Sequence, residues 1–221
     1  MSDADNGRHF LYFADPMCSW CYGFGPVIAG LARHFEGRLP IRMIMGGLRA
    51  GNTQAMRDKD KDYIRGAWDQ VEEASGQPFD RAFFEREAFV YDTEPACRAV
   101  VVMRHRAPDA ALTFKARISS AFYAHNRDVT DDEVLADIAA EAGDDRAAFL
   151  ADLQSAEARN ATFRDFMIAK EAGVEGFPLL AAGSEATGYA LVCQGFRPID
   201  GLPEAIEDWL AKGAPVTPRQ A

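Results

Sequence analysis

Basic residues, cysteine and long apolar runs are all scarce in this sequence. Its 24 Lys and Arg residues are outnumbered by 34 Asp and Glu, which gives a formal net charge of -10 at pH 7. A chain this acidic is poorly suited to nucleic acid or to an anionic membrane surface. The longest apolar runs, residues 99–103 and 178–182, are far too short to cross a bilayer. We therefore expect neither a nucleic-acid partner nor a membrane partner.

Only four cysteines occur in 221 residues, and the polar, acidic N-terminus lacks the apolar segment of a secretory signal. We expect a cytoplasmic protein, and in that reducing compartment structural disulfides are rare. A close cysteine pair there favours catalytic or redox chemistry. The histidines have no metal-ligand spacing and none adjoins the close cysteine pair, so a Cys-His hydrolase is unsupported. They are His9, His34, His105 and His125.

Two of the cysteines stand three positions apart, after an apolar segment. Residues 10–14 read as a buried strand, and Asp15 and Pro16 interrupt it. Cys18 and Cys21 then open a helix. Because a helix N-terminus offers unpaired N–H groups and positive dipole charge, we expect Cys18 to ionise easily and to act as a nucleophile. Cys21 lies one turn further on nearly the same face and can close a disulfide ring with Cys18.

A metal site is the main alternative for this motif. Structural zinc needs four ligands and usually a second close pair, whereas Cys97 and Cys193 stand alone and far apart. We expect those two to be buried, inert thiols. Met17 precedes Cys18, and a Met-x-Cys-x-x-Cys loop would supply soft ligands suited to Cu(I).

The surrounding pattern predicts a β-α-β unit. A helical stripe over residues 24–35, with a kink near Tyr22 to Pro26, leads to a strand over residues 41–45 that must pair in parallel. Chemistry in such sheets lies beyond the carboxyl ends of the strands, where Cys18 falls. Near the C-terminus we expect a strand over 179–182, a turn over 183–188, an antiparallel strand over 190–194 and a helix over 202–210.

Between these two parts, about 120 residues show helical periodicity and read as an inserted helical domain. The sequence from Thr130 to Glu133 predicts a capping box ahead of one of its helices. Apolar residues at helical spacing are expected to form buried faces and to serve as scaffold. In the last inserted helix these are Phe163, Phe166 and Met167.

Five segments carry a family resemblance: DPMCSWCYGFGP at 15–26, GGLRAG at 46–51, YDTEPACRAV at 91–100, AFYAHNRDVTDDEVL at 121–135 and GVEGFPLL at 173–180. Together they resemble the thioredoxin fold in its DsbA-like form, which contains a helical insertion. The likeness is strongest to bacterial DsbA-family proteins known as predicted protein-disulfide isomerases, a group without signal peptides. The resemblance implies an α/β fold: a thioredoxin-like mixed sheet in residues 7–50 and 172–213, with an inserted all-helical domain in residues 51–171.

The resemblance also implies roles for individual residues. Cys18 would attack a substrate disulfide and Cys21 would resolve the mixed disulfide. Pro178 matches the position at which these folds keep a cis peptide, so that the backbone near Phe177 can pair with a bound peptide. Trp20 offers an apolar surface beside the sulfur for a substrate side chain, or alternatively packs at the domain interface.

One departure from the family pattern concerns the dipeptide between the cysteines. DsbA has Pro-His there, whereas this chain has Ser19 and Trp20. An imidazolium helps to stabilise a thiolate and an indole cannot, so we expect a less depressed Cys18 pKa and a less oxidising pair than in DsbA. This favours reduction or isomerisation of disulfides in a protein or a small thiol compound, without a bound cofactor. Glutathione could serve as the reductant.

Two other functions stay open. Kappa-class transferases and 2-hydroxychromene-2-carboxylate isomerases share the inserted architecture and depend on glutathione, although they use a lone serine or its equivalent instead of a CxxC pair. A non-enzymatic metal-binding or redox-sensing module is the second alternative. The sequence defines neither the physiological substrate and recycling partner, nor the direction of electron flow, nor the oligomeric state.

Overall fold

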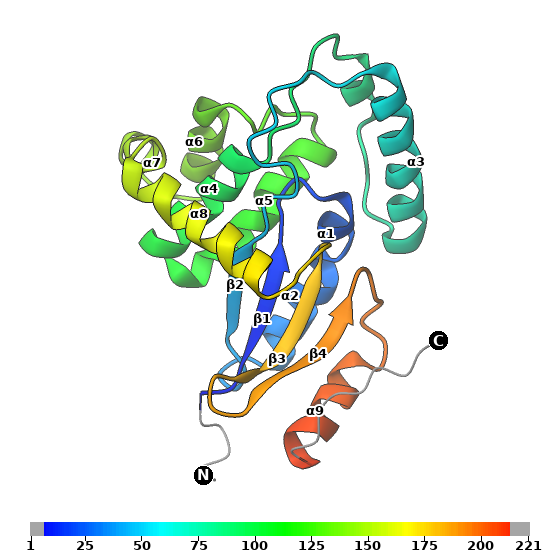
Figure 1. Ribbon diagram of the computed structural model, residues 1–221, viewed down its shortest axis with the longest axis vertical. Coiled ribbons are helices and arrows are strands. Elements are labelled where there is room, and N and C mark those ends of the chain that lie inside the picture. Colours follow the sequence, from blue (N-terminus) through cyan, green and yellow to red (C-terminus); the bar gives the residue numbers. More distant parts are fainter. Residues whose placement is uncertain (1–6, 213–221) are drawn as a thin grey trace.

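A single four-stranded sheet organises residues 7–212, the part of the chain that this computed structural model describes (Figure 1). Its strand order is β2-β1-β3-β4. The strands are β1 (His9–Ala14), β2 (Ile41–Met45), β3 (Leu179–Ser184) and β4 (Gly188–Gln194). β1 pairs in parallel with β2 and antiparallel with β3, and β3 pairs antiparallel with β4. The mixed thioredoxin-like sheet predicted from the sequence is therefore confirmed.

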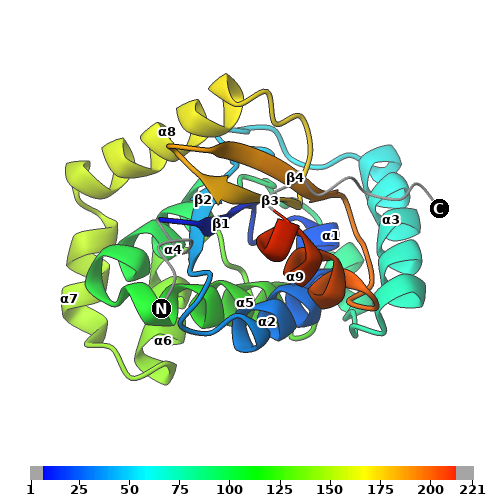
Figure 2. The same cartoon turned by 90° about the horizontal axis from the view of Figure 1, so that it is seen from below.

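Helices cover both faces of this sheet. In Figures 1 and 2, α2 (Gly25–His34) and α9 (Leu202–Lys212) lie against one face, and α8 (Ala156–Glu171) crosses the other. Five further α-helices and two short 3-10 helices also separate β2 from β3 in the chain. They are α3 (Asp58–Ser75), η2 (Arg81–Glu85), α4 (Glu94–Arg106), η3 (Pro108–Ala110), α5 (Ala111–Tyr123), α6 (Asp132–Glu141) and α7 (Arg146–Leu153). The helical insertion is thus confirmed. Its division from the sheet part at residues 51–171 stays a prediction, and residue 213 lies outside the described residues.

The kink predicted near Tyr22 to Pro26 appears as a one-residue interruption at Phe24 between two helices. A short helix, α1 (Ser19–Gly23), follows the first cysteine, and α2 begins at Gly25. The N–H of Phe24 still donates to Trp20 O at 2.9 Å. Pro26 has no N–H to continue the ladder, and it lies in the first turn of α2, where that loss costs little.

Two predictions about the inserted helices were wrong. The N-cap of α6 is Asp131, whose carboxylate accepts from the N–H of Glu133, whereas the Thr130 hydroxyl donates to Asp128 at 2.6 Å. A carboxylate one position later therefore serves as the cap that we assigned to the hydroxyl. In α8, Phe163 is 61% exposed, so it is not part of a buried face.

The buried residues of α8 are small or polar, whereas Phe166 is partly buried and packs against the core. The buried residues are Ala158, Ala161, Thr162, Asp165 and Ala169. Asp165 accepts from the N–H of Met45 at 2.9 Å and forms an ion pair with Arg104 at 2.8 Å, so α8 lies close to both β2 and α4. Small side chains permit this close approach, and that is why the apolar spacing identified the face only in part.

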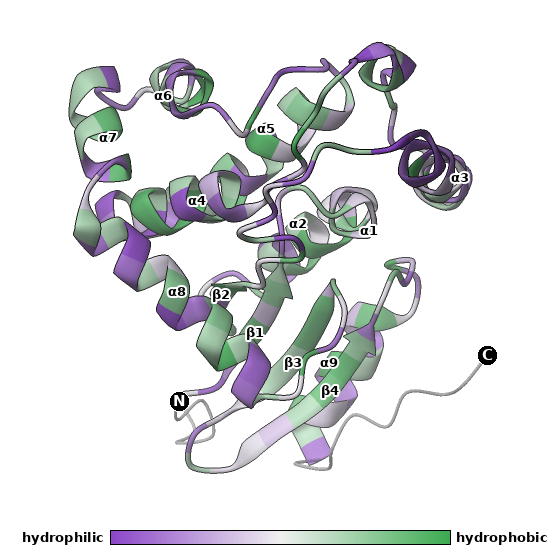
Figure 3. Ribbon diagram, turned by 45° about the horizontal axis from the view of Figure 1, so that its top comes forward, coloured by the Kyte–Doolittle hydropathy of each residue, from purple (hydrophilic) through white to green (hydrophobic). Residues whose placement is uncertain are grey.

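Aromatic side chains form most of the core between α3 and α5. Trp68 is 1% exposed, and its ring lies 5.0 Å from that of Phe83 and 5.2 Å from that of Tyr123. Tyr123 in turn stacks on Tyr22 of α1 at 5.0 Å. Figure 3 shows the contrast around this core: α3 is largely hydrophilic at the periphery, and the sheet strands are mostly hydrophobic. The aromatic cluster thereby connects the outer helices to the cysteine segment.

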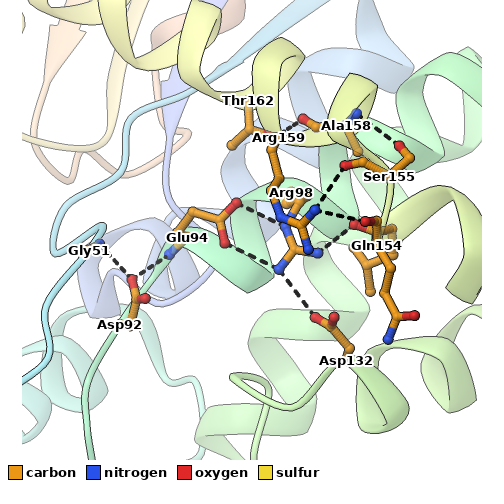
Figure 4. Close-up of polar contacts among 11 residues, drawn as sticks. Gly51, Asp92, Glu94, Arg98, Asp132, Gln154, Ser155, Ala158, Arg159 and Thr162 are labelled. Carbon is orange, nitrogen blue, oxygen red and sulfur yellow. Dashed lines mark hydrogen bonds and ion pairs between the residues drawn. The ribbon is translucent and has the colours of Figure 1, made fainter.

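A buried arginine joins three of the inserted helices (Figure 4). Arg98 of α4 donates to Glu94 at 2.8 Å, to Asp132 of α6 at 3.2 Å and to the Leu153 carbonyl at the end of α7. The Arg98 side chain is 6% exposed. A guanidinium at this depth is tolerated only because its donors are paired, so this cluster fixes how the helices sit together.

Candidate active site

Cys18 lies directly beyond the carboxyl end of β1, as predicted. It is the N-cap residue of α1, with an extended backbone (φ -94, ψ 119). Its N–H donates to Asp15 O at 3.1 Å, and its carbonyl accepts from Tyr22 N at 3.0 Å. Cys18 is 6% exposed and Cys21 is fully buried. The turn and the helix start thus present the first cysteine towards the outside and the second towards the interior.

The two sulfurs differ in acidity. The pKa of Cys18 is lowered, chiefly because the Cys21 thiol hydrogen-bonds to its sulfur; burial opposes this, and the Cys21 N–H adds to the lowering. Burial raises the pKa of Cys21 well above that of an ordinary thiol, and its hydrogen bond with Cys18 raises it further. The Cys21 N–H at the start of the helix lowers the Cys18 pKa, as the sequence suggested, but the Cys21 thiol lowers that pKa more. Cys18 is the sulfur that ionises first.

The loop before β3 lies beside Cys18. The Phe177–Pro178 peptide bond is cis, as the resemblance implied. Cys18 Sγ donates to Phe177 O at 3.5 Å, and Pro178 O accepts from Gly195 N at 2.8 Å. Two segments that are 159 positions apart in the chain therefore meet at the sulfur.

The structure places Trp20 against the loop after β4, and the choice between a substrate surface and packing at the domain interface stays a prediction. The Trp20 side chain is half-buried, and its ring lies 5.9 Å from that of Phe196, in the loop after β4. It therefore packs across the junction between α1 and the end of the sheet while part of the indole stays accessible next to the CxxC segment.

Two glycines allow the loop after β2 to approach the site. A Cβ atom at Gly46 would lie 2.0 Å from Phe177 Cζ. Gly47 has a φ of +66, and a Cβ there would lie 2.7 Å from Phe166 Cε1. Sequence reasoning noted the GGLRAG segment only as part of the resemblance. The contact between Gly46 and Phe177 shows that this loop supports the backbone next to Cys18.

Asp15 was read from the sequence only as a strand breaker, but it organises the turn. It is fully buried and accepts from Met17 N at 2.8 Å, from Leu48 N at 2.7 Å and from Cys97 Sγ at 3.5 Å. Burial raises the pKa of Asp15, and these hydrogen bonds oppose the rise. The carboxylate joins the cysteine segment, the loop after β2 and α4 at one point.

Side chains from the inserted helices and the loop before α4 hold the cysteine segment from the other side. Three backbone carbonyls in residues 16–21 accept a hydrogen bond from a buried side chain. The pairs are Ser119 with Pro16 at 2.7 Å, Tyr91 with Met17 at 2.5 Å, and Lys115 with Cys21 at 2.9 Å. No spacing rule in the sequence indicated these contacts, because the partners are between 74 and 103 positions apart.

The other two cysteines are buried, as predicted. Cys97 is fully buried and Cys193 is 5% exposed; burial raises the pKa of both thiols, that of Cys193 to about 11. None of the four cysteines is in a disulfide. Within residues 7–212, no group of three or more His, Cys, Asp and Glu side chains could hold a metal ion. No described helix is long and apolar enough to cross a membrane.

A mixed sheet that places a CxxC segment against a cis-proline loop, with a helical insertion, defines the DsbA-like class of thioredoxin-fold thiol–disulfide oxidoreductases. The family model described as Thioredoxin matches residues 11–201, so the chain belongs to this thioredoxin family.

Several known proteins are similar to this chain. A candidate protein disulfide isomerase from Nitrosomonas europaea is 34% identical with a TM-score of 0.85, and the match covers 94% of this chain and all of that protein. The cytosolic disulfide reductase DsbM from Pseudomonas aeruginosa shares the fold at 24% identity and a TM-score of 0.75, over 92% and 98% of the two chains. DsbM has also been solved with GSH. The ClpXP adapter protein SpxH of Halalkalibacterium halodurans is 25% identical over 96% of this chain and 78% of its own length.

Proposed function

We propose that this protein reduces or isomerises disulfide bonds, with Cys18 as the attacking cysteine and Cys21 as the resolving cysteine. The observation that carries the proposal is the placement of Cys18 at the N-terminus of α1, with its Sγ 3.5 Å from Phe177 O and with Cys21 fully buried one turn further on. The pKa of Cys18 is lowered and that of Cys21 is raised. The more acidic sulfur is the one nearer the surface, and this is the arrangement that a two-step exchange requires.

The reaction follows from these two acidities. The Cys18 thiolate attacks one sulfur of a substrate disulfide; a Cys18–substrate bond forms, and the other substrate sulfur leaves as a thiolate that takes a proton from water. Cys21 then loses its proton and attacks Cys18 Sγ, forming the Cys18–Cys21 disulfide and releasing the second substrate thiol. The dithiol supplies two electrons in total. An external thiol, such as glutathione, is needed to restore it.

Substrate contact is assigned to Trp20, Phe177 and Pro178. The Phe177 carbonyl lies 3.5 Å from the reacting sulfur, and the accessible part of Trp20 lies two residues along the chain from Cys18. An extended peptide segment could hydrogen-bond to the backbone at Phe177 while its disulfide meets Cys18.

Reduction or isomerisation suits this site better than strong oxidation. Between the cysteines stand Ser19 and Trp20, neither of which carries the positive charge that would strongly stabilise the Cys18 thiolate. A cytoplasmic location would supply the reducing conditions, and the similarity to a cytosolic disulfide reductase supports this placement.

Reduction of insulin disulfides with a glutathione-based recycling system tests the proposal. Cys18→Ser is expected to abolish turnover, and Cys21→Ser is expected to stop after one event and accumulate a mixed disulfide. Cys193→Ser is the matched control, because that thiol is equally buried and lies outside the pair. Turnover by the Cys18→Ser protein would refute the proposed role of Cys18.

A glutathione-dependent transferase or isomerase is the alternative enzyme, and the GSH-bound structure of DsbM supports keeping it. Such an enzyme needs one thiol or hydroxyl beside the bound glutathione and no second cysteine. Cys21→Ser separates the two reactions: loss of disulfide turnover supports exchange, and retained activity on a glutathione adduct supports the alternative.

A non-enzymatic role is suggested by the sequence similarity to SpxH, which is called a ClpXP adapter protein. Adapter binding requires a docking surface and no redox cycle, so a protein with this role would retain partner binding after Cys18→Ser. The metal-binding alternative is tested separately by metal analysis of protein purified without chelator. One equivalent of a soft metal would favour it over disulfide exchange.

A further inference from the structure

A buried lysine lies behind the cysteine pair, and the exchange reaction as described makes no use of it. Lys115 of α5 is 2% exposed, and its Nζ donates to the Cys21 carbonyl at 2.9 Å. An ammonium group buried to this extent is costly unless negative charge lies nearby. One backbone carbonyl satisfies a hydrogen bond but does not neutralise the charge.

The negative groups around Lys115 indicate which group neutralises its charge. Burial lowers the pKa of Lys115, and negative charge on Cys21, Cys18, Asp15 and Cys97 raises it, in that order of size. Asp15 is already held by two backbone N–H groups and by Cys97. The sulfur of Cys21 is therefore the foremost partner for the Lys115 charge.

The hydroxyl of Tyr12 also interacts with the sulfur of Cys21. This hydroxyl, on β1, is fully buried and has no hydrogen-bond partner of good geometry among the described residues. Burial, then the charges of Cys21 and Cys18, raise the Tyr12 pKa well above its usual value. A buried O–H donor without a firm partner beside Cys21 is available to a thiolate that forms there.

We propose that Lys115 is a positioning residue that stabilises the Cys21 thiolate in the resolving step, with Tyr12 as an additional donor. The inference deepens the proposed function and rests on it. In that step Cys21 gives its proton to solvent, its sulfur bonds to Cys18 Sγ, and the bond from Cys18 to the substrate sulfur breaks. Lys115 keeps its own proton throughout and contributes only charge.

Several titratable groups face Lys115 and share its electrostatic environment. They are Cys18 and Cys21 of the CxxC segment, Asp15 after β1, and Cys97 of α4. The hydroxyls of Tyr12, Tyr91 and Tyr123 interact in turn with the charge on Cys18. Burial raises the pKa of each of these three tyrosines, so they stay protonated at neutral pH. The pH dependence near neutrality is therefore expected to come from the cysteines, because Lys115 keeps its proton throughout.

A two-phase reaction with 5,5′-dithiobis(2-nitrobenzoate) tests the inference. Attack by Cys18 releases a first thionitrobenzoate, and attack by Cys21 on the resulting mixed disulfide releases a second. We expect Lys115→Met and Lys115→Gln to slow the second release by about tenfold and to move its pH midpoint up by about one unit. The first release should change less. Lys115→Arg should keep most of the wild-type rate because it keeps the charge.

Lys115→Gln separates charge from hydrogen bonding, since an amide can still donate to the Cys21 carbonyl. Lys61→Met is the matched control: Lys61 of α3 donates to the carbonyls of Phe84 at 3.3 Å and Arg86 at 2.6 Å, and neither belongs to the CxxC segment. We expect this variant to lose thermal stability while both release phases and their pH dependence stay unchanged. A wild-type second phase in Lys115→Gln would overturn the role of Lys115.

A measurement on the wild-type protein covers the case in which the Lys115 variants fail to fold. The Nζ resonance of Lys115 is followed by ¹⁵N NMR against pH in the reduced and oxidised protein. Thiolate charge exists only in the reduced form, so the Lys115 pKa should be higher there. Equal values would overturn the inference. Absence of a second release in the wild-type protein would instead refute the proposed function itself.

Discussion

The sheet part of the molecule and its helical part contribute different things to the same site. The sheet part supplies the sulfurs of Cys18 and Cys21 and the carbonyl of Phe177. The segment from β2 to β3 supplies the side chains that hold the cysteine segment and its charge, including Lys115, which is 94 positions away from Cys21. The reacting atoms therefore come from short segments of the sheet part, whereas their acidity and their placement depend on side chains from the helical part.

The largest effect is expected from a substitution within the helical part of the molecule. Arg98→Met leaves Glu94 and Asp132 without their buried cation, so we expect unfolding free energy to fall by about 3 kcal/mol. Denaturant unfolding measures this loss. Arg127→Met is the control, because its ion pair with Glu141 is largely exposed and should contribute less than about 1 kcal/mol. Equal losses in the two variants would contradict the structural role of Arg98.

A second substitution disturbs the sheet part of the molecule, beside the cysteine pair. Gly46→Ala places a methyl group 2.0 Å from Phe177 Cζ, so the ring and its backbone must shift. We expect a loss of about 2 kcal/mol in unfolding free energy and slower insulin reduction, because Phe177 O neighbours the Cys18 sulfur. Gly66→Ala in α3 is the control: nothing lies within 4 Å of its added Cβ, and alanine favours a helix. If Gly46→Ala behaves like Gly66→Ala, the loop does not support the site.

The smallest effect is expected from removing one hydrogen bond between the helical part and the cysteine segment. Tyr91→Phe deletes the hydroxyl that donates to Met17 O at 2.5 Å and leaves that buried carbonyl without this donor. The expected loss is about 1 kcal/mol of unfolding free energy. Tyr63→Phe should change nothing measurable, since Tyr63 is 76% exposed. Thermal unfolding of both variants under identical conditions decides between a real and a negligible contribution.

Features that depend on neighbouring residues could be predicted from the sequence. β1 and β2 appear at the predicted positions because their runs of apolar residues match a buried strand. The start of α1 at the cysteine pair followed from the break at Asp15 and Pro16. Pro178 was identified only through the family resemblance, since its dipeptide carries no such signal.

Features set by tertiary contact could not be predicted in this way. The lysine at position 115 has the sequence appearance of a solvent-exposed helix residue, and only the packing of α5 against α1 buries it. The buried face of α8 contains Asp165 and small residues because α8 crosses β2 closely, and a periodicity argument weights large apolar side chains instead. In both cases a polar group is buried because a distant segment supplies its partner.

The account depends most on the acidity of Cys18, and the rate of its alkylation by iodoacetamide across pH measures that acidity directly. We predict a midpoint below the ordinary thiol value of about 8.5, so that Cys18 is ionised above this lower midpoint. We also predict that Cys21→Ala raises the midpoint, because the Cys21 thiol is the main cause of the lowering. A midpoint at or above that of a free thiol, unaffected by Cys21→Ala, would contradict the account.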